Sequence, residues 1–235
     1  MRRFWNTARI EAGSDGFRVL LDGKPMRLPG GAPLLVDRPA LAEALAAEWQ
    51  QAGGEPGGEI GFDDLPLTRL TGTAQARIAA DPACCIEALV RYGESDLLCY
   101  RAEGPPALVE RQDHAWQPWL DWARTGLGAA LRVTTGVVYV PQEREALAAL
   151  RWALTGHDPL ALAALGVAVP ALSSLVLGLA LARFELSAAE AMALATLDET
   201  FQQELWGSDA EALARRAAVA AEVASAARLL ELARR

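Results

Sequence analysis

The chain has 235 residues, enough for one large or two small domains with a real hydrophobic core. Its formal charge is −8 and its pI is near 4.9, so no basic stripe can neutralise a phosphate backbone and we expect no nucleic-acid partner. Three cysteines, two of them adjacent, fit neither a disulfide framework nor the paired spacing of a zinc site, which favours a reducing, cytoplasmic compartment.

The first residues carry the strand signals. The start, MRRFWNTARI, contains no apolar stretch of signal-peptide length, so we expect no leader, and Phe4–Ile10 predicts a strand. The segment Gly16–Pro29 places Asp22 and Gly23 between two short apolar runs. An Asp-Gly pair in that setting is typical of a β-hairpin turn.

One helix follows the predicted strands. Pro39 begins it, and Leu41, Leu45 and Trp49 recur at a spacing that places them on one face. The helix is expected to end at the glycines of the Gly53–Glu59 loop, whose composition indicates a flexible connector. We therefore predict a β-rich N-terminal domain with one helix over residues 1–60.

The remaining residues, 61–235, are predicted to form a mainly helical domain. Residues 131–140 interrupt the helical pattern with β-branched side chains, and we interpret them as a strand that returns to the N-terminal sheet. The predicted fold class is therefore α+β, with a small N-terminal β-rich domain packed on a larger, mainly α-helical C-terminal domain.

The segment Pro159–Ala182 contains 24 residues without a charge, long enough on length alone to span a membrane. Gly166 indicates the end of one short helix and Pro170 the start of another. Apolar runs broken by turn signals favour a protein core, so we predict a buried helical hairpin and no integral membrane segment.

The stretch Tyr92–Arg101, YGESDLLCYR, combines several unlike side chains in ten residues. Gly93 predicts the end of a helix, and the apolar Leu97–Cys99 that follows predicts a strand or a buried turn. Asp96 and Arg101 bracket this apolar segment. On local grounds both charges are expected in solvent, since charges carried by loops are usually solvated.

The C-terminal third contains two capping-box patterns, Ser187 with Glu190 and Ser208 with Glu211. Between them, an apolar helical stripe is formed by Leu194, Leu197, Phe201 and Leu205. The side chains that fall off this stripe are Glu199, Gln202, Gln203 and Trp206. We predict that Trp206 is exposed, which suits either a partner-binding patch or a local contact at the helix end.

A search for catalytic chemistry finds no motif. The sequence lacks a phosphate loop, a dinucleotide fingerprint, HExxH and GxSxG. The two histidines, His114 and His157, have no neighbouring ligands at metal spacing, so we expect no metal or cofactor. One enzymatic alternative stays open, a small-molecule enzyme whose cleft between the two domains is lined by Glu94, Asp96 and Asp198.

Several segments together resemble a known family over nearly the whole chain. They are GFRVLLDGKPMRLP at Gly16–Pro29, Glu48-Trp49, PLTRL at Pro66–Leu70, YGESDLLCYR at Tyr92–Arg101, TTGVVYVPQ at Thr134–Gln142, and the series Leu197-Asp198-Glu199, Gln202, Trp206-Gly207 and Glu211. In these the chain resembles the chaperones that assemble the soluble head of the F-type ATP synthase by binding its alpha subunit. It departs from that family at Gly72, where asparagine is usual.

The resemblance implies a non-enzymatic, ATP-independent chaperone without a cofactor. Such a protein covers an apolar surface of the unassembled alpha subunit until the beta subunit replaces it. We predict the partner-binding residues on one helix, at Asp198, Glu199, Gln202 and Trp206, as a combined aromatic anchor and charge site. A secondary set comprises Glu94, Asp96 and Arg101. No catalytic residue is implied, and we expect a cytoplasmic monomer.

Overall fold

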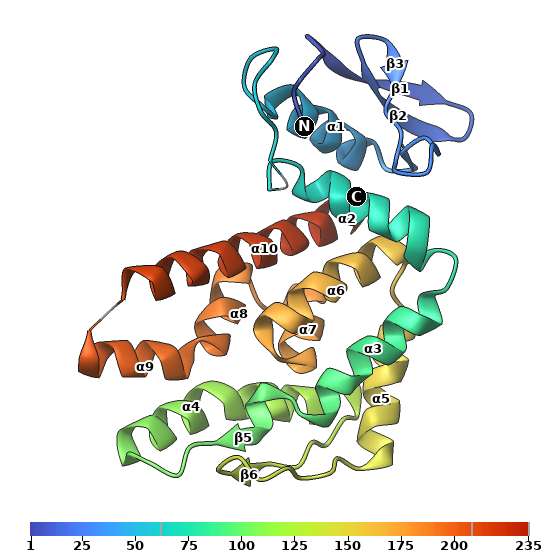
Figure 1. Cartoon of the computed structure of the whole chain (residues 1–235). Coiled ribbons are helices and arrows are strands. Elements are labelled where there is room, and N and C mark those ends of the chain that lie inside the picture. The colour runs from blue at the N-terminus through green and yellow to red at the C-terminus, as the bar shows by residue number, and fades with distance from the viewer. Residues whose placement is uncertain (62, 208, 235) are drawn as a thin grey trace. The chain divides into compact units, whose positions relative to one another are not determined.

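A computed structural model describes residues 1–61, 63–207 and 209–234. Strands are concentrated near the N-terminus and most of the remaining chain is helical, which confirms the predicted α+β class (Figure 1). The chain divides into two compact units. The first comprises Met1–Pro82, Pro159–Ala164 and the chain from Arg228 onward, and the second comprises Ala83–Asp158 and Leu165–Ala227. The first unit thus extends beyond residue 60, where the sequence predicts a boundary.

The sheet of the first unit is antiparallel. It contains β1 (Ala8–Gly13), β2 (Gly16–Leu21), β3 (Lys24–Pro25) and β4 (Leu35–Val36), in the order β1-β2-β3 with β4 also paired to β2. Asp22 and Gly23 both have positive φ, +47° and +80°, as the tight hairpin turn between β2 and β3 requires. The Asp22 carboxylate also accepts backbone hydrogen bonds from Thr7 and Asn6, which lower its pKa. The predicted hairpin is confirmed.

Helix α1 (Pro39–Gln51) buries the predicted apolar face and contacts β1 and β2. At its C-terminal end, the Glu48 carboxylate accepts two backbone hydrogen bonds, of 2.6 and 2.9 Å, from the first turn of α2 (Pro66–Thr73). The next residue, Trp49, donates its indole N–H to the Thr68 hydroxyl over 2.9 Å. Burial raises the pKa of Glu48. The Glu48-Trp49 and PLTRL motifs are therefore two halves of one contact.

Helix α2 continues through Gly72 into a single π turn, η1 (Ala74–Ile78). A Cβ atom at Gly72 would lie 2.8 Å from Cδ2 of Leu28, closer than side-chain atoms normally approach. The close approach of Leu28 therefore explains why a residue without a Cβ occupies this position.

The Gly53–Glu59 loop is tied to the N-terminal segment through Arg3. This buried guanidinium donates to the carbonyl oxygens of Trp5, Gln50, Ala52 and Gly54, among others. The Arg3 backbone also exchanges hydrogen bonds with Gly57 and Gly58, over 2.8 and 2.9 Å. The loop is held by its backbone carbonyls, which sequence composition alone does not reveal.

Most of the helices belong to the second unit. They are α3 (Pro82–Glu94), α4 (Pro106–Trp122), α5 (Arg144–Thr155), α6 (Pro159–Leu172), α7 (Leu175–Ala182), α8 (Ala188–Ala195), α9 (Leu197–Trp206) and α10 (Ala210–Arg234), with α6 and α10 extending into the first unit. Shorter elements are η2 (Leu97–Cys99), η3 (Ala123–Leu127), β5 (Tyr100–Arg101) and β6 (Thr134–Thr135). The core of this unit includes the fully buried Trp116, Leu150 and Leu175.

Helix α3 passes through Gly93 and ends at Glu94, so the prediction that Gly93 lies beyond the helix is wrong. A Cβ at this glycine would lie 2.7 Å from Cδ1 of Leu150 in α5. Gly93 permits close packing inside the helix and does not terminate it.

The expected strand over residues 131–140 is reduced to β6, which pairs in parallel with β5. The predicted return of this segment to the N-terminal sheet is therefore wrong. The Gln142 side chain closes the segment by accepting from the Arg132 N–H over 2.7 Å and donating to the Arg132 carbonyl over 3.0 Å. Two hydrogen bonds at the base make residues 132–142 a closed loop, a local constraint that overrides β-branched composition.

Helices α6 and α7 form the predicted hairpin, but the break falls at Ser173 and not at Gly166. Ser173 has φ +50°, and the Ser174 hydroxyl accepts from the Leu177 N–H over 3.0 Å, as an N-cap does. Within the described residues, no helix is both long and apolar enough to cross a membrane.

Candidate functional site

Helix α9 carries the four residues expected to bind a partner, and α8 leads into it. The capping box at the start of α8 is present, with the Ser187 hydroxyl and the Glu190 carboxylate each satisfying the other residue's backbone N–H. The second predicted box includes Ser208, which lies outside the described residues. Near it, the Asp209 carboxylate accepts from the Ala212 N–H over 3.2 Å at the start of α10.

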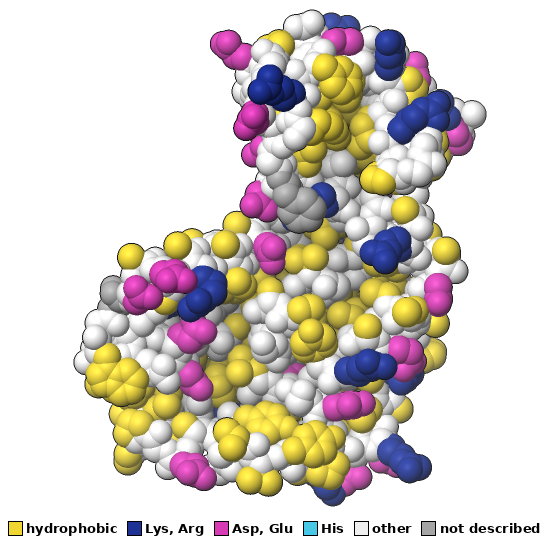
Figure 2. All heavy atoms as spheres, in the orientation of Figure 1, with side chains coloured by type: hydrophobic (Ala, Val, Ile, Leu, Met, Phe, Trp, Pro, Cys, Tyr) yellow, Lys and Arg dark blue, Asp and Glu magenta, His cyan; other side chains and the backbone are white. Residues whose placement is uncertain are grey.

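The faces of α9 differ sharply in exposure. Leu197 and Phe201 are buried, whereas Glu199, Gln202 and Trp206 recur at helical spacing on the exposed face. The Trp206 side chain is 79% exposed, which confirms the prediction for that residue. Figure 2 shows acidic and hydrophobic side chains beside one another over α9 and α10.

One residue of the predicted apolar stripe is exposed. Leu205, next to Trp206 at the end of α9, is 59% exposed. Leu205 therefore lies on the predicted apolar stripe but outside the buried part of that stripe. The exposed apolar surface at this helix end is larger than the sequence pattern predicts.

Asp198 turns away from the exposed face and contacts α4. Its Oδ1 accepts a hydrogen bond of 2.7 Å from Nε2 of Gln112, which is buried. The Gln112 Oε1 accepts from the Ala102 N–H over 2.7 Å, and the Gln112 carbonyl accepts from the Arg101 guanidinium over 2.7 Å. Asp198 thus differs in environment from Glu199, its neighbour in the predicted set.

Further contacts hold both flanks of α9. On the α4 side, Arg111 pairs with Glu204 at 2.9 Å and lies over the Phe201 ring, 5.2 Å from its centroid. The hydrogen bond between the two charged groups lowers the pKa of Glu204 and raises that of Arg111. On the α10 side, Arg216 donates to the Thr200 hydroxyl over 3.2 Å and to the Gln203 side-chain oxygen. Contacts on two sides fix the orientation of α9 within this unit.

The secondary set does not form one site. Glu94 is exposed at the end of α3, whereas Arg101 is buried beneath α4 with its guanidinium 5.4 Å from the Trp116 ring centroid. Burial lowers the pKa of Arg101, and the Asp113 charge opposes that shift. The expectation that Asp96 and Arg101 lie in solvent is wrong, because both side chains hold neighbouring segments together.

Asp96 is completely buried and acts on the start of α7. Its carboxylate accepts from the Ser174 hydroxyl over 2.7 Å, the Val176 N–H over 3.0 Å and the Leu98 N–H over 3.1 Å. Burial raises the pKa of Asp96 to about 6, although the three donors oppose that shift. The YGESDLLCYR motif thus contains a helix-anchoring carboxylate.

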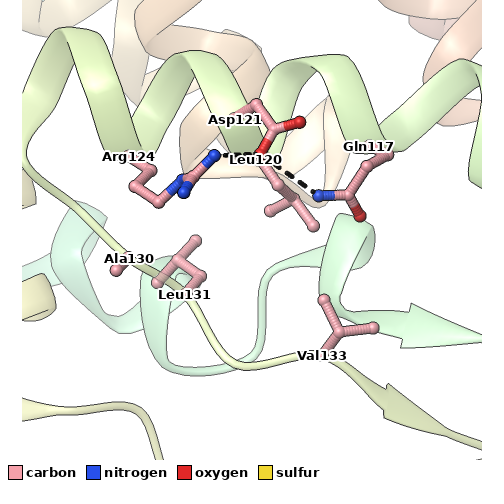
Figure 3. Close-up of a pocket in the computed structure, with 7 residues that line it drawn as sticks. All are labelled: Gln117, Leu120, Asp121, Arg124, Ala130, Leu131 and Val133. Atoms are coloured by element: carbon pink, nitrogen blue, oxygen red, sulfur yellow. Dashed lines mark hydrogen bonds and ion pairs between the residues drawn. The ribbon is translucent and has the colours of Figure 1, made fainter.

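The three acids of the enzymatic alternative lie in different surroundings. Glu94 is exposed, Asp96 is buried against the start of α7 and Asp198 accepts from Gln112. None of the three lines either of two hollows in the described part of the chain. The more enclosed hollow, of about 280 Å³, lies between α4 and the segment before β6 (Figure 3). Its one carboxylate, Asp121, already accepts from Gln117 and Arg124. In the part of the chain that the structure describes, no cluster of His, Cys, Asp and Glu can hold a metal ion.

The polar residues that support α9 escape prediction from the sequence. Gln112 occupies a position between Leu108 and Trp116 on the apolar stripe of α4, four residues from each. A single amide on an apolar stripe is the signal that could have found it, since a buried amide needs specific partners. Arg111 and Arg216 give no comparable signal.

Comparison with known proteins gives a consistent match. A family model described as "ATP12 chaperone protein" matches residues 2–124. The crystal structure of Atp12 from Paracoccus denitrificans is 42% identical, has a TM-score of 0.90, and the match covers 98% of this chain and 97% of that one. The Atu1473 protein of Agrobacterium tumefaciens is 41% identical with a TM-score of 0.91, over 98% of this chain and 85% of that one.

A more distant relative comes from a eukaryote. The mitochondrial protein atp12 of Schizosaccharomyces pombe is 25% identical over 218 residues, and the match covers 88% of this chain and 74% of that protein. The matches to the two bacterial structures cover 98% of this chain. They therefore include α9 and the residues that contact it, which lie beyond the part that the family model matches.

Proposed function

The chain belongs to the ATP12 family of chaperones for ATP synthase assembly, and we propose that it binds the unassembled alpha subunit through the exposed face of α9. In this proposal the chaperone covers an apolar surface of the alpha subunit until the beta subunit replaces it. It works without catalysis or cofactor, as a monomer in the cytoplasm.

The exposure of Trp206 on a fixed helix is the observation that carries the proposal. Tryptophan is enriched among the residues that dominate binding energy at protein interfaces, because one side chain buries a large apolar area. Leu205 adds exposed apolar surface beside it, and Glu199 and Gln202 supply polar groups on the same helix. A surface already held in place loses little conformational entropy on binding.

Substitution of this tryptophan tests the proposal directly. The chain is co-expressed with the alpha subunit from the same source, without beta, and the co-elution of the two on size exclusion is measured. Trp206→Ala is expected to weaken the complex by about 2 kcal/mol or more, roughly thirtyfold, because the aromatic anchor is lost. Glu199→Lys is expected to weaken it further through the reversed charge.

The chain offers a matched control for this experiment. Trp152 on α5 is also 79% exposed, so Trp152→Ala removes the same exposed ring from another helix. Equal loss of alpha binding in both variants would contradict a specific role of α9. Absence of any complex with the unmodified chain would contradict alpha binding itself.

A further inference from the structure

On the basis of the partner surface proposed above, we infer that Gln112 is a positioning residue that sets the orientation of α9 for binding. Its side chain is 1% exposed and uses both ends of the amide. The oxygen accepts from Ala102, just after β5, and the nitrogen donates to Asp198. Gln112 does not face the partner and acts through Asp198.

The geometry of α9 explains why this contact controls the exposed face. Asp198 lies in the first turn of the helix, and adjacent helical residues differ in direction by about 100°. When Asp198 is held against α4, Glu199 points away from α4. Rotation of α9 is restrained by this hydrogen bond together with the burial of Phe201 in the next turn. With both contacts in place, Glu199 and Trp206 stay on the exposed face.

A positioning role and a direct contact role for Asp198 predict opposite results for one substitution. Asp198→Asn removes the charge but keeps an oxygen that can accept from Gln112, because the amide can present either end. A directly contacting carboxylate would lose its interaction with the alpha subunit. A positioning hydrogen bond would survive.

The test uses four variants of the full chain, co-expressed with the alpha subunit as above. Asp198→Asn, which keeps the hydrogen bond, is expected to bind about tenfold more tightly than Gln112→Glu, which sets two carboxylates against each other. The pair Gln112→Glu with Asp198→Asn restores a donor and an acceptor and is expected to recover binding. Asp198→Ala removes the acceptor without burying a charge and is also expected to weaken binding. It takes the place of Gln112→Glu in the test if that variant fails to fold.

Thermal unfolding of each variant separates positioning from loss of fold. Weak binding by Asp198→Asn, or no recovery in the paired variant despite an intact fold, would overturn the role of Gln112. If the unmodified chain itself binds no alpha subunit, the proposed function fails first, and the inference falls with it.

Discussion

Helices α7 and α9 both depend on polar contacts from distant segments, yet the two contacts lie at different depths. The start of α7 is held by Asp96, a carboxylate buried completely and surrounded by three donors. The start of α9 is held through Asp198, which is half-buried and has Gln112 as its partner. A fully buried carboxylate is costly to disturb, whereas a half-buried one can orient a helix without carrying the stability of the fold.

Removal of the deep carboxylate is the largest expected effect. Asp96→Ala leaves the Ser174 hydroxyl and two backbone N–H groups without their acceptor, at a cost of roughly 3–5 kcal/mol in the free energy of unfolding. Urea unfolding measures this loss. The exposed Asp15, which pairs with Arg18 at the surface, is the control, and Asp15→Ala is expected to cost less than about 1 kcal/mol. Similar losses of stability in the two variants would show that a buried carboxylate contributes no more than an exposed one.

The same carboxylate gives stability a dependence on pH. The pKa of Asp96 is about 6 in the folded chain against an ordinary value of 3.8, so the folded state binds the proton more tightly. Its stabilising contribution is present below about pH 4 and is lost as the pH rises through 6, by roughly 3 kcal/mol at most. The difference in unfolding free energy between the unmodified chain and Asp96→Asn, measured from pH 4 to 7, isolates this change. A difference that is independent of pH would show that the burial of Asp96 does not raise its pKa.

Close packing near the deep contact gives an intermediate effect. Gly93→Ala places a Cβ against Leu150 and is expected to cost about 1–3 kcal/mol. Gly166→Ala is a matched control, because a Cβ at that helical position meets no atom within 4 Å. It is expected to stabilise the chain by up to about 1 kcal/mol. The prediction is wrong if urea unfolding shows that both substitutions change the free energy of unfolding in the same direction.

The smallest expected effect concerns a helix start that uses only local contacts. Ser187→Ala removes the N-cap of α8 and is expected to cost about 1 kcal/mol. Ser187→Asp keeps an acceptor at the cap and is expected to retain most of the stability. If Ser187→Ala lost as much stability as Asp96→Ala, a local N-cap and a buried carboxylate from a distant segment would contribute equally, contrary to the prediction.

Local signals in the sequence are sufficient where the structure depends on neighbouring residues. The Asp22-Gly23 turn, the Ser187 capping box and the buried face of α1 are all predictable, because each follows from spacing over a few residues. The exposure of Trp206 follows in the same way from helical periodicity.

Prediction fails where a distant segment decides the outcome. Gly93 has the local signature of a helix end, but Leu150 from α5 explains it. The strand expected over 131–140 is limited to Thr134–Thr135, whose partner is β5 and not the N-terminal sheet. Gln112 escapes notice because its side-chain partners lie 10 and 86 residues away. Tertiary contacts of this kind leave little trace in local composition.

The loop closed by Gln142 has a practical consequence. Its base is joined by two hydrogen bonds, whereas Val137 at its tip is 96% exposed. An exposed loop tip of this kind is expected to tolerate added residues. A fluorescent label or an epitope inserted after Val137 would therefore report on the chaperone while leaving the exposed face of α9 unmodified.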